Sequence, residues 1–173
     1  GICTAHLPDI LAVVFAANWQ NVEGTAQAVE RAQRLRDAMA IDRGRLLVLP
    51  VPSRFETQVE YERGKLWLDV YAERFGPLFA PWAHRDSSPA DLLNQLKVPY
   101  VPFWSFGEEL PVLKERRPAA ADISHAVHSL AALLARRLEG SDAFLSGRDA
   151  YVAGARAEDA VGETHDIYLS YTR

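Results

Sequence analysis

His125 and His128 are the residues of this sequence that most suggest metal chemistry. They stand three positions apart in a stretch of helical spacing, so both imidazoles could face the same way. Structural and catalytic zinc sites need three or four ligands, and no cysteine or carboxylate clearly joins this pair. Because histidines on a helix surface are common, the sequence predicts no metal site.

Two other small groups suggest acid–base or nucleophilic chemistry. Glu108 and Glu109 could act as general acid and base, but adjacent side chains rarely converge on one substrate atom. A solvated turn or helix start is the more ordinary interpretation. Cys3 and His6 have the composition of a thiol–imidazole pair without a third orienting group, and a buried structural cysteine is the alternative. We therefore assign no catalytic residue.

The phosphate-binding loop of Walker type does not occur in the sequence. No Gly-x-x-x-x-Gly-Lys followed by Ser or Thr is present in the 173 residues, and neither is Gly-x-Ser-x-Gly, Cys-x-x-Cys or His-Glu-x-x-His. The sequence therefore predicts that this chain alone does not catalyse phosphoryl transfer.

The composition is that of an ordinary soluble globular domain. The formal net charge is −4, with acids and bases mixed along the chain, which argues against a nucleic-acid partner. No apolar run approaches the ~20 residues of a membrane-spanning helix, and no basic stretch followed by an apolar one resembles a signal peptide. A single cysteine indicates no oxidising compartment. We expect a cytoplasmic protein without a membrane partner.

The elements that must position any site alternate between strand and helix. Continuous apolar runs over 10–17 and 46–51 predict strands covered on both faces. Helical spacing follows each strand, over 22–35 and over 57–75, and Gly76 with Pro77 ends the second helix.

The alternation of strand and helix continues in the second half of the chain. Ser88 is a plausible cap of a short helix with Pro89 in its first turn. A third strand is predicted over 98–104, and the clearest helix over 121–138. Strand and helix in alternation predict an α/β fold, here a partial doubly wound, mainly parallel sheet with flanking helices.

Residues 139–163 and 164–173 differ from this pattern. The first range carries four glycines and little apolar periodicity, and we interpret it as a linker, flexible at least in part. The second has the composition of a single strand, which would not be stable without a partner.

As a set, the segments over 1–138 resemble the carboxyl-terminal part of ParA/MinD-like P-loop NTPases. The segment Gly-Ile-Cys-Thr-Ala-His-Leu-Pro-Asp looks like the one after the family's switch aspartate. Further segments are similar to the turn before the next helix, to two later strands and to the closing elements: 18–24, 47–54, 98–103, 108–112 and 121–138. The resemblance implies an incomplete P-loop NTPase fold.

The same resemblance implies a nucleotide site. Ser53 and Arg54 occupy the place of an Asn-Arg pair that contacts adenine in relatives, and Pro102 and Phe103 end the strand that closes over the base. Serine cannot supply the paired contacts of an amide, which puts the preference for adenine in question. ATP and Mg²⁺ are the ligands expected for the parent protein. Packing within the core or an interface is the alternative role for the aromatic side chain.

His165-Asp166-Ile167-Tyr168-Leu169-Ser170-Tyr171 is similar to the opening strand of TIR domains. These domains act as interaction modules or as NAD hydrolases, whose catalytic glutamate lies well downstream and outside this chain. The resemblance implies that 164–173 begins a TIR domain after the 139–163 linker.

Together these features predict part of an ATP-dependent switch coupled to a TIR effector. This chain would be the base-binding part and would not be catalytic alone. Self-association through the NTPase domain and contact with other TIR domains are the expected partnerships. The alternative is a degenerate NTPase-like scaffold or protein-interaction module that hydrolyses no nucleotide.

Overall fold

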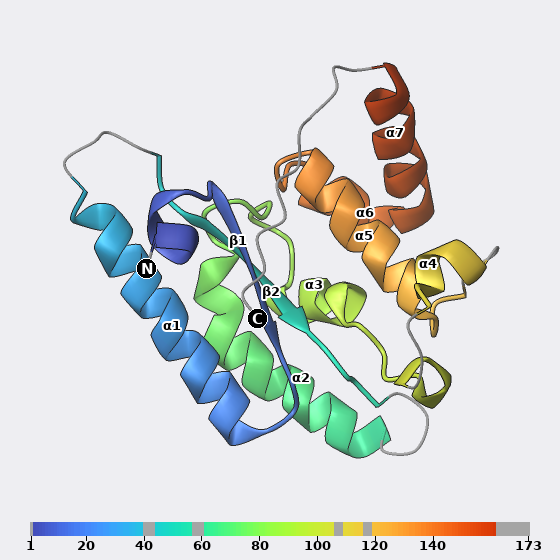
Figure 1. Cartoon of the computed structure of the whole chain (residues 1–173), viewed down its shortest axis with the longest axis horizontal. Helices are drawn as coiled ribbons and strands as arrows, with labels where there is room; N and C mark the ends of the chain where they lie inside the picture. The colour runs from blue at the N-terminus through green and yellow to red at the C-terminus, as the bar shows by residue number, and fades with distance from the viewer. Residues whose placement is uncertain (1, 40–43, 57–60, 106–108, 116–118, 162–173) are drawn as a thin grey trace.

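The computed structural model describes residues 2–39, 44–56, 61–105, 109–115 and 119–161. These residues form a mixed α/β structure in which helices flank a parallel pair of strands (Figure 1). The elements in chain order are η1 (Ile2–His6), β1 (Ile10–Phe15), α1 (Trp19–Asp37), β2 (Leu47–Pro52), α2 (Tyr61–Phe75), η2 (Gly76–Leu78), α3 (Pro89–Leu96), η3 (Pro102–Ser105), α4 (Pro111–Lys114), α5 (Ile123–Ala135), α6 (Ser141–Ser146) and α7 (Arg148–Val161).

The two predicted strands pair in parallel, in a register that sets Ile10 opposite Leu47. The covered strand that the sequence predicts is confirmed for β2, which is buried along nearly its whole length. For β1 the prediction is wrong on one face, because Ala12 and Val14 are exposed, Val14 to 62%. The open face of β1 is therefore an apolar surface of the described residues.

The predicted third strand is reduced to a single parallel bridge between Phe55 and Pro99. The amide of Tyr100 donates to the carbonyl oxygen of Phe55 at 3.0 Å, and the chain then turns into η3. The expectation of a strand over 98–104 is wrong beyond this point. Pro99 and Pro102 have no amide hydrogen to donate, so the ladder cannot continue.

Side-chain caps begin two of the helices. The Asn18 side chain accepts a hydrogen bond from the amide of Asn21 at 2.9 Å, at the start of α1. The predicted cap of α3 is confirmed, because the Ser88 hydroxyl accepts from the amide of Asp91 at 3.3 Å and Pro89 occupies the first turn. Both caps satisfy amides that have no acceptor within their helix.

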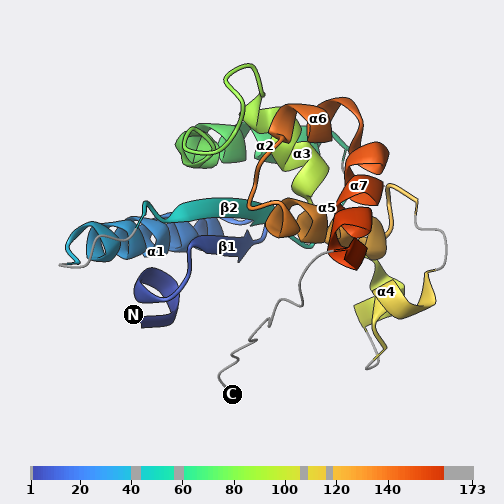
Figure 2. The same ribbon diagram turned by 90° about the horizontal axis from the view of Figure 1, so that it is seen from above.

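Helices α1 and α2 contact each other along their sides. Arg74 of α2 pairs with Glu23 at 3.1 Å and Glu30 at 3.4 Å, and the rings of Trp19 and Trp67 lie 5.2 Å apart. Figure 2 shows α2 and α3 on one side of the strands, with α7 at the opposite end of the molecule from α1. Among the helices described, none has the length and apolarity that crossing a membrane requires.

The expectation of a linker over 139–163 is wrong for its described part. Residues 141–161 form α6 and α7, which pack onto the larger hydrophobic core. Phe144 is fully buried, and Tyr151, Val152 and Ala155 are buried at helical spacing. Their burial stabilises these helices despite the glycines. The segment 164–173, expected to begin a TIR domain, lies outside the described residues.

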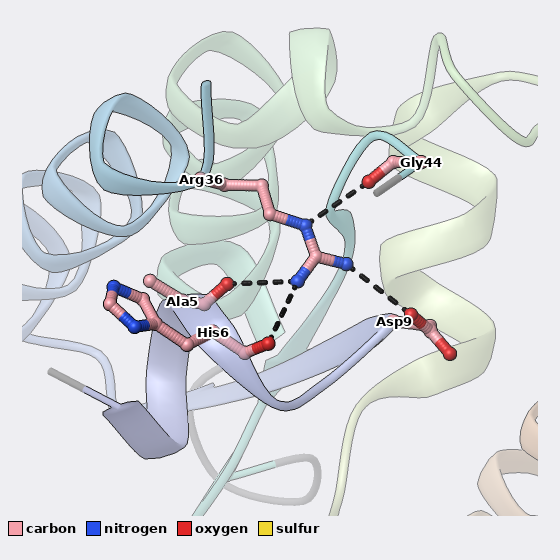
Figure 3. A network of polar contacts seen from close by, with 5 residues as sticks. All are labelled: Ala5, His6, Asp9, Arg36 and Gly44. Carbon is pink, nitrogen blue, oxygen red and sulfur yellow. Dashed lines mark hydrogen bonds and ion pairs between the residues drawn. The ribbon is translucent and has the colours of Figure 1, made fainter. Parts of the chain in front are cut away.

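A buried arginine ties the amino-terminal segment to α1 (Figure 3). Arg36 is 4% exposed, and its guanidinium donates to the carbonyl oxygens of Ala5 at 3.0 Å, His6 at 3.2 Å and Gly44 at 3.1 Å. It also contacts the Asp9 carboxylate at 3.3 Å. The planar fork of arginine donors suits such convergence, which holds η1 and the entry to β2 in place.

Tyr71 of α2 lies at the centre of the larger core with its ring edge-on to Phe15 at 4.9 Å. Its hydroxyl is buried, and the described residues offer it no hydrogen-bond partner. Burial raises the pKa of Tyr71 to about 12. The folded protein therefore contains a hydroxyl group that was stripped of water without compensation.

We expect Tyr71→Phe to raise the free energy of unfolding by about 1 kcal/mol, because it removes that uncompensated hydroxyl and keeps the ring. The raised pKa means that the native state keeps this proton between about pH 10 and about pH 12, where the unfolded chain loses it. Stability therefore falls as pH rises through this window, and the variant should lose less of it. Urea denaturation at pH 7 and at pH 10.5 measures both effects, and a variant less stable than the wild type at pH 7 would contradict the prediction.

Candidate functional site

The chain leaves β2 through Ser53 and Arg54 at the edge where both parallel strands end. The amide of Ser53 donates to the carbonyl oxygen of Phe15, the last residue of β1, at 2.7 Å. In open α/β sheets, ligands bind beyond the carboxyl ends of the strands. The first two predicted site residues therefore lie at the edge that such sheets use for ligands.

Arg54 has a left-handed backbone conformation, with φ of 52°. For a residue other than glycine this costs about 1–2 kcal/mol. The hydrogen bond of Ser53 on one side and the Phe55 bridge on the other hold the backbone there. The exposed guanidinium then lies 5.4 Å from the centre of the Tyr100 ring, a cation–π arrangement.

Pro102 and Phe103 follow in η3, directly after the bridged segment, and both are exposed. The Phe103 side chain is 75% exposed, and its ring lies edge-on to Trp104 with the centroids 4.8 Å apart. We call Ser53, Arg54, Tyr100, Pro102 and Phe103 the strand-end surface. It offers the exposed ring of Phe103, the half-buried ring of Tyr100, a planar cation and a hydroxyl, which suit stacking on a flat ligand better than acid–base chemistry.

A cavity of about 440 Å³ lies beside this surface, between α2 and α3. Phe55, Gly64 and Leu68 line part of it, and the Lys97 amine lies 2.6 Å from the Asn94 side-chain oxygen. The amine also lies 5.3 Å from the centre of the Phe55 ring. Burial lowers the pKa of Lys97. Phe55 thus joins the cavity to the strand-end surface.

A second cavity, of about 510 Å³, lies far along the chain between the end of α5 and α7. The Arg136 guanidinium there binds both carboxylate oxygens of Glu158, at 2.8 and 2.5 Å, and lies 4.5 Å from the centre of the Tyr151 ring. Because its charged donors already have partners in the protein, we interpret this cavity as a packing feature that fixes α7.

The other residues that suggested chemistry are histidines, carboxylates and a cysteine, and the structure describes only some of them. Burial lowers the pKa of His125 and of His128. Within the part of the chain that the structure describes, no group of three or more His, Cys, Asp or Glu side chains could hold a metal ion. Glu109 pairs with Lys114 at 2.8 Å. Glu108 and the side chain of Cys3 lie outside the described residues.

Sequence reasoning missed three residues of this region: Tyr100, Lys97 and Glu115. Tyr100 stands between the two prolines of a segment that the sequence did single out, but its contact with Arg54 has no local signature. The contacts of Lys97 with Phe55 depend on how α3 packs and have no local signature. Glu115, which accepts from the Trp104 indole at 2.9 Å, has none either.

Comparisons with protein-family models, curated proteins and solved structures found no match to this chain.

Proposed function

We propose that this chain is the base-binding part of a nucleotide-dependent switch that is coupled to a TIR domain and does not catalyse hydrolysis by itself. ATP with Mg²⁺ is the proposed ligand of the complete switch. Because the 173 residues contain no Walker-type loop, the phosphates and the metal ion would be held by other parts of that switch.

The observation that carries the proposal is the pairing of Arg54 with Tyr100 at the edge where both strands end. Two parallel strands end side by side, and the segment after β2 is bridged to the segment before η3. This brings the Arg54 guanidinium over the Tyr100 ring, with the exposed Phe103 ring three residues further on. Purine recognition uses these groups, stacking on aromatic faces and on guanidinium planes.

Each proposed contact is weak on its own. Stacking of one base contributes about 1–3 kcal/mol, and the Ser53 hydroxyl can add one hydrogen bond where an asparagine would add two. We therefore expect this chain to bind adenosine with a dissociation constant on the order of 1 mM or weaker. Tight binding of the nucleotide would come from phosphate and Mg²⁺ contacts outside this chain.

An NMR titration of the ¹⁵N-labelled chain with adenosine, and separately with ATP and Mg²⁺, tests the proposal. We expect shifts at the amides of Ser53, Arg54, Tyr100 and Phe103, with similar affinities for the two ligands because the phosphates find no loop. Absence of shifts at these amides would refute base binding. Binding of ATP at micromolar concentration, unmatched by adenosine, would reveal a phosphate site in this chain. That result would contradict the proposal that the phosphates are held elsewhere in the switch.

Two substitutions and a matched control localise the effect. Phe103→Ser removes the exposed ring, and Arg54→Gly removes the guanidinium while allowing the left-handed backbone. Each should weaken adenosine binding at least about fivefold, the lower range of a lost stacking contact. Leu113→Ser in α4, at a side chain that is 76% exposed, should leave binding unchanged. Equal loss in all three variants would indicate nonspecific association.

The second candidate is a scaffold that binds a protein partner, another TIR domain or a second copy of itself. The apolar surface of β1 at Ala12 and Val14 favours it, as do the exposed Leu110 and Leu113 at α4. Sedimentation at increasing protein concentration separates the candidates. Association that Val14→Ser abolishes, without any response to adenosine, would favour the scaffold.

A further inference from the structure

The carboxylate of Glu115 joins η3 to the amino end of α5. One oxygen accepts a hydrogen bond from the Trp104 indole nitrogen at 2.9 Å, and the other accepts from the amide of Ser124 at 2.9 Å. Trp104 in turn supports the exposed Phe103 ring edge-on. A single side chain thus connects the strand-end surface with a helix that lies beyond it.

The position of Ser124 makes this contact more than incidental. Ser124 is the second residue of α5, and amides in the first turn of a helix have no acceptor within the helix. The Glu115 carboxylate supplies the acceptor, and its negative charge is favourable at the positive end of the helix. Ser124 is also fully buried, so water does not readily replace this acceptor.

A second charged side chain connects α5 to α7. The Arg148 guanidinium donates to the carbonyl oxygen of His125 at 2.6 Å and to the hydroxyl of Ser129 at 2.8 Å. Ser129 is fully buried between the helices. Hydrogen bonds to charged groups contribute about 1.5–3 kcal/mol each, so the first turns of α5 and α7 are firmly connected at this point.

We propose that Glu115 is a positioning residue, which fixes η3, the element that carries the Phe103 ring, and couples ligand binding there to α5 and, through Arg148, to α7. The coupling to a ligand rests on the proposed base-binding function. The structural link between Trp104 and Ser124 does not, and the two can be tested separately. In this arrangement, ligand binding at the strand-end surface changes the contacts of α7, the last described element.

Glu115→Gln is the informative variant, because both partners of the carboxylate are donors. A glutamine amide has one acceptor oxygen, and its NH₂ group would face the remaining donor. One of the two contacts must therefore break while the size and shape of the side chain are kept. Glu73→Gln on α2, at an exposed position, is the matched control.

Hydrogen exchange without ligand tests the link. We expect the donor that loses its acceptor, either the Ser124 amide or the Trp104 indole N–H, to exchange at least about tenfold faster in Glu115→Gln, because a hydrogen bond to a charged acceptor is lost. Neither group should change its exchange rate in Glu73→Gln. The single substitution Trp104→Phe should accelerate exchange of the Ser124 amide, and should have no further effect on it in the Glu115→Gln background. Additive effects of the two substitutions, or wild-type exchange at both donors in Glu115→Gln, would overturn the proposal.

The adenosine titration then tests transmission. We expect the amides of Ser124 and Arg148 to shift together with that of Phe103 in the wild type, and to stop shifting in Glu115→Gln while Phe103 still responds. Shifts at Phe103 that never reach Ser124 in the wild type would refute the coupling and leave the proposed function intact. No shift at Phe103 would refute the function, and the exchange experiment would then decide the link alone.

Discussion

Arg36→Met is expected to lower the free energy of unfolding by about 3 kcal/mol, because it leaves one buried and two partly buried carbonyl oxygens without their donors, at about 1–3 kcal/mol for the buried one and less for the others. The oxygens concerned are those of Ala5, His6 and Gly44, which the guanidinium now binds at 3.0 to 3.2 Å. Methionine keeps the apolar stem and removes every donor. Since about 1 kcal/mol corresponds to about 2–4 °C for a domain of this size, the melting temperature should fall by about 6–12 °C.

Two controls separate the buried network from charge effects. Arg34→Met removes the same charge from an exposed position of α1 and should change stability by less than about 0.5 kcal/mol. Asp9→Asn removes the carboxylate that Arg36 contacts, but this side chain is 91% exposed, so the loss should be at most about 1 kcal/mol. Chemical denaturation measures all three variants. An Arg36→Met variant as stable as Arg34→Met would show that water satisfies the carbonyl groups.

Local signals were enough for the first half of the fold. The strands of β1 and β2 and the cap at Ser88 depend on consecutive residues, and the structure confirms all three, although one face of β1 is exposed. Parallel pairing of β1 and β2 follows from a helix between two strands, since such a crossover returns the chain in the same direction. These predictions needed no knowledge of distant contacts.

The predictions that failed concern features that are set by packing between elements distant in the sequence. On α5, the apolar side chains of Val127 and Leu134 are 36% and 40% exposed. The buried face is instead one of small residues, among them Ser124 and Ser129. Arg148 of α7 binds Ser129 there, so the orientation of α5 is set by a partner helix that the sequence was not expected to contain.

The candidate site likewise contains residues that the sequence could place and residues that it could not. Ser53 and Arg54 could be placed because the carboxyl ends of parallel strands share one edge. Their neighbour Tyr100 could not, because its place beneath Arg54 depends on a left-handed turn at that arginine. The link through Glu115 requires η3, α4 and α5 to meet, and no spacing in the sequence encodes that meeting.

Helices α6 and α7 give the second large expected effect, because they decide whether 139–161 belongs to the folded unit. Phe144 of α6 is fully buried and lies edge-on to Tyr151 at 5.5 Å, within the same core as β2, α2 and α3. Phe144→Ala should therefore lower the free energy of unfolding by about 3–5 kcal/mol, the range for removing a buried phenylalanine. The same substitution in an unpacked linker would leave the free energy of unfolding almost unchanged.

Phe103→Ala is the matched control, since it removes the same side chain from a position that is 75% exposed. It should change stability by less than about 0.5 kcal/mol. Urea denaturation followed by far-ultraviolet circular dichroism and by tryptophan fluorescence should show one transition in the wild type, shifted as a whole in Phe144→Ala. Because Trp67 and Trp82 report on the core around α2 and η2, a shift that they share means that α6 and α7 unfold with the sheet. A transition that leaves their fluorescence at the wild-type midpoint would make α6 and α7 a separate unit, and the core would then end before residue 139.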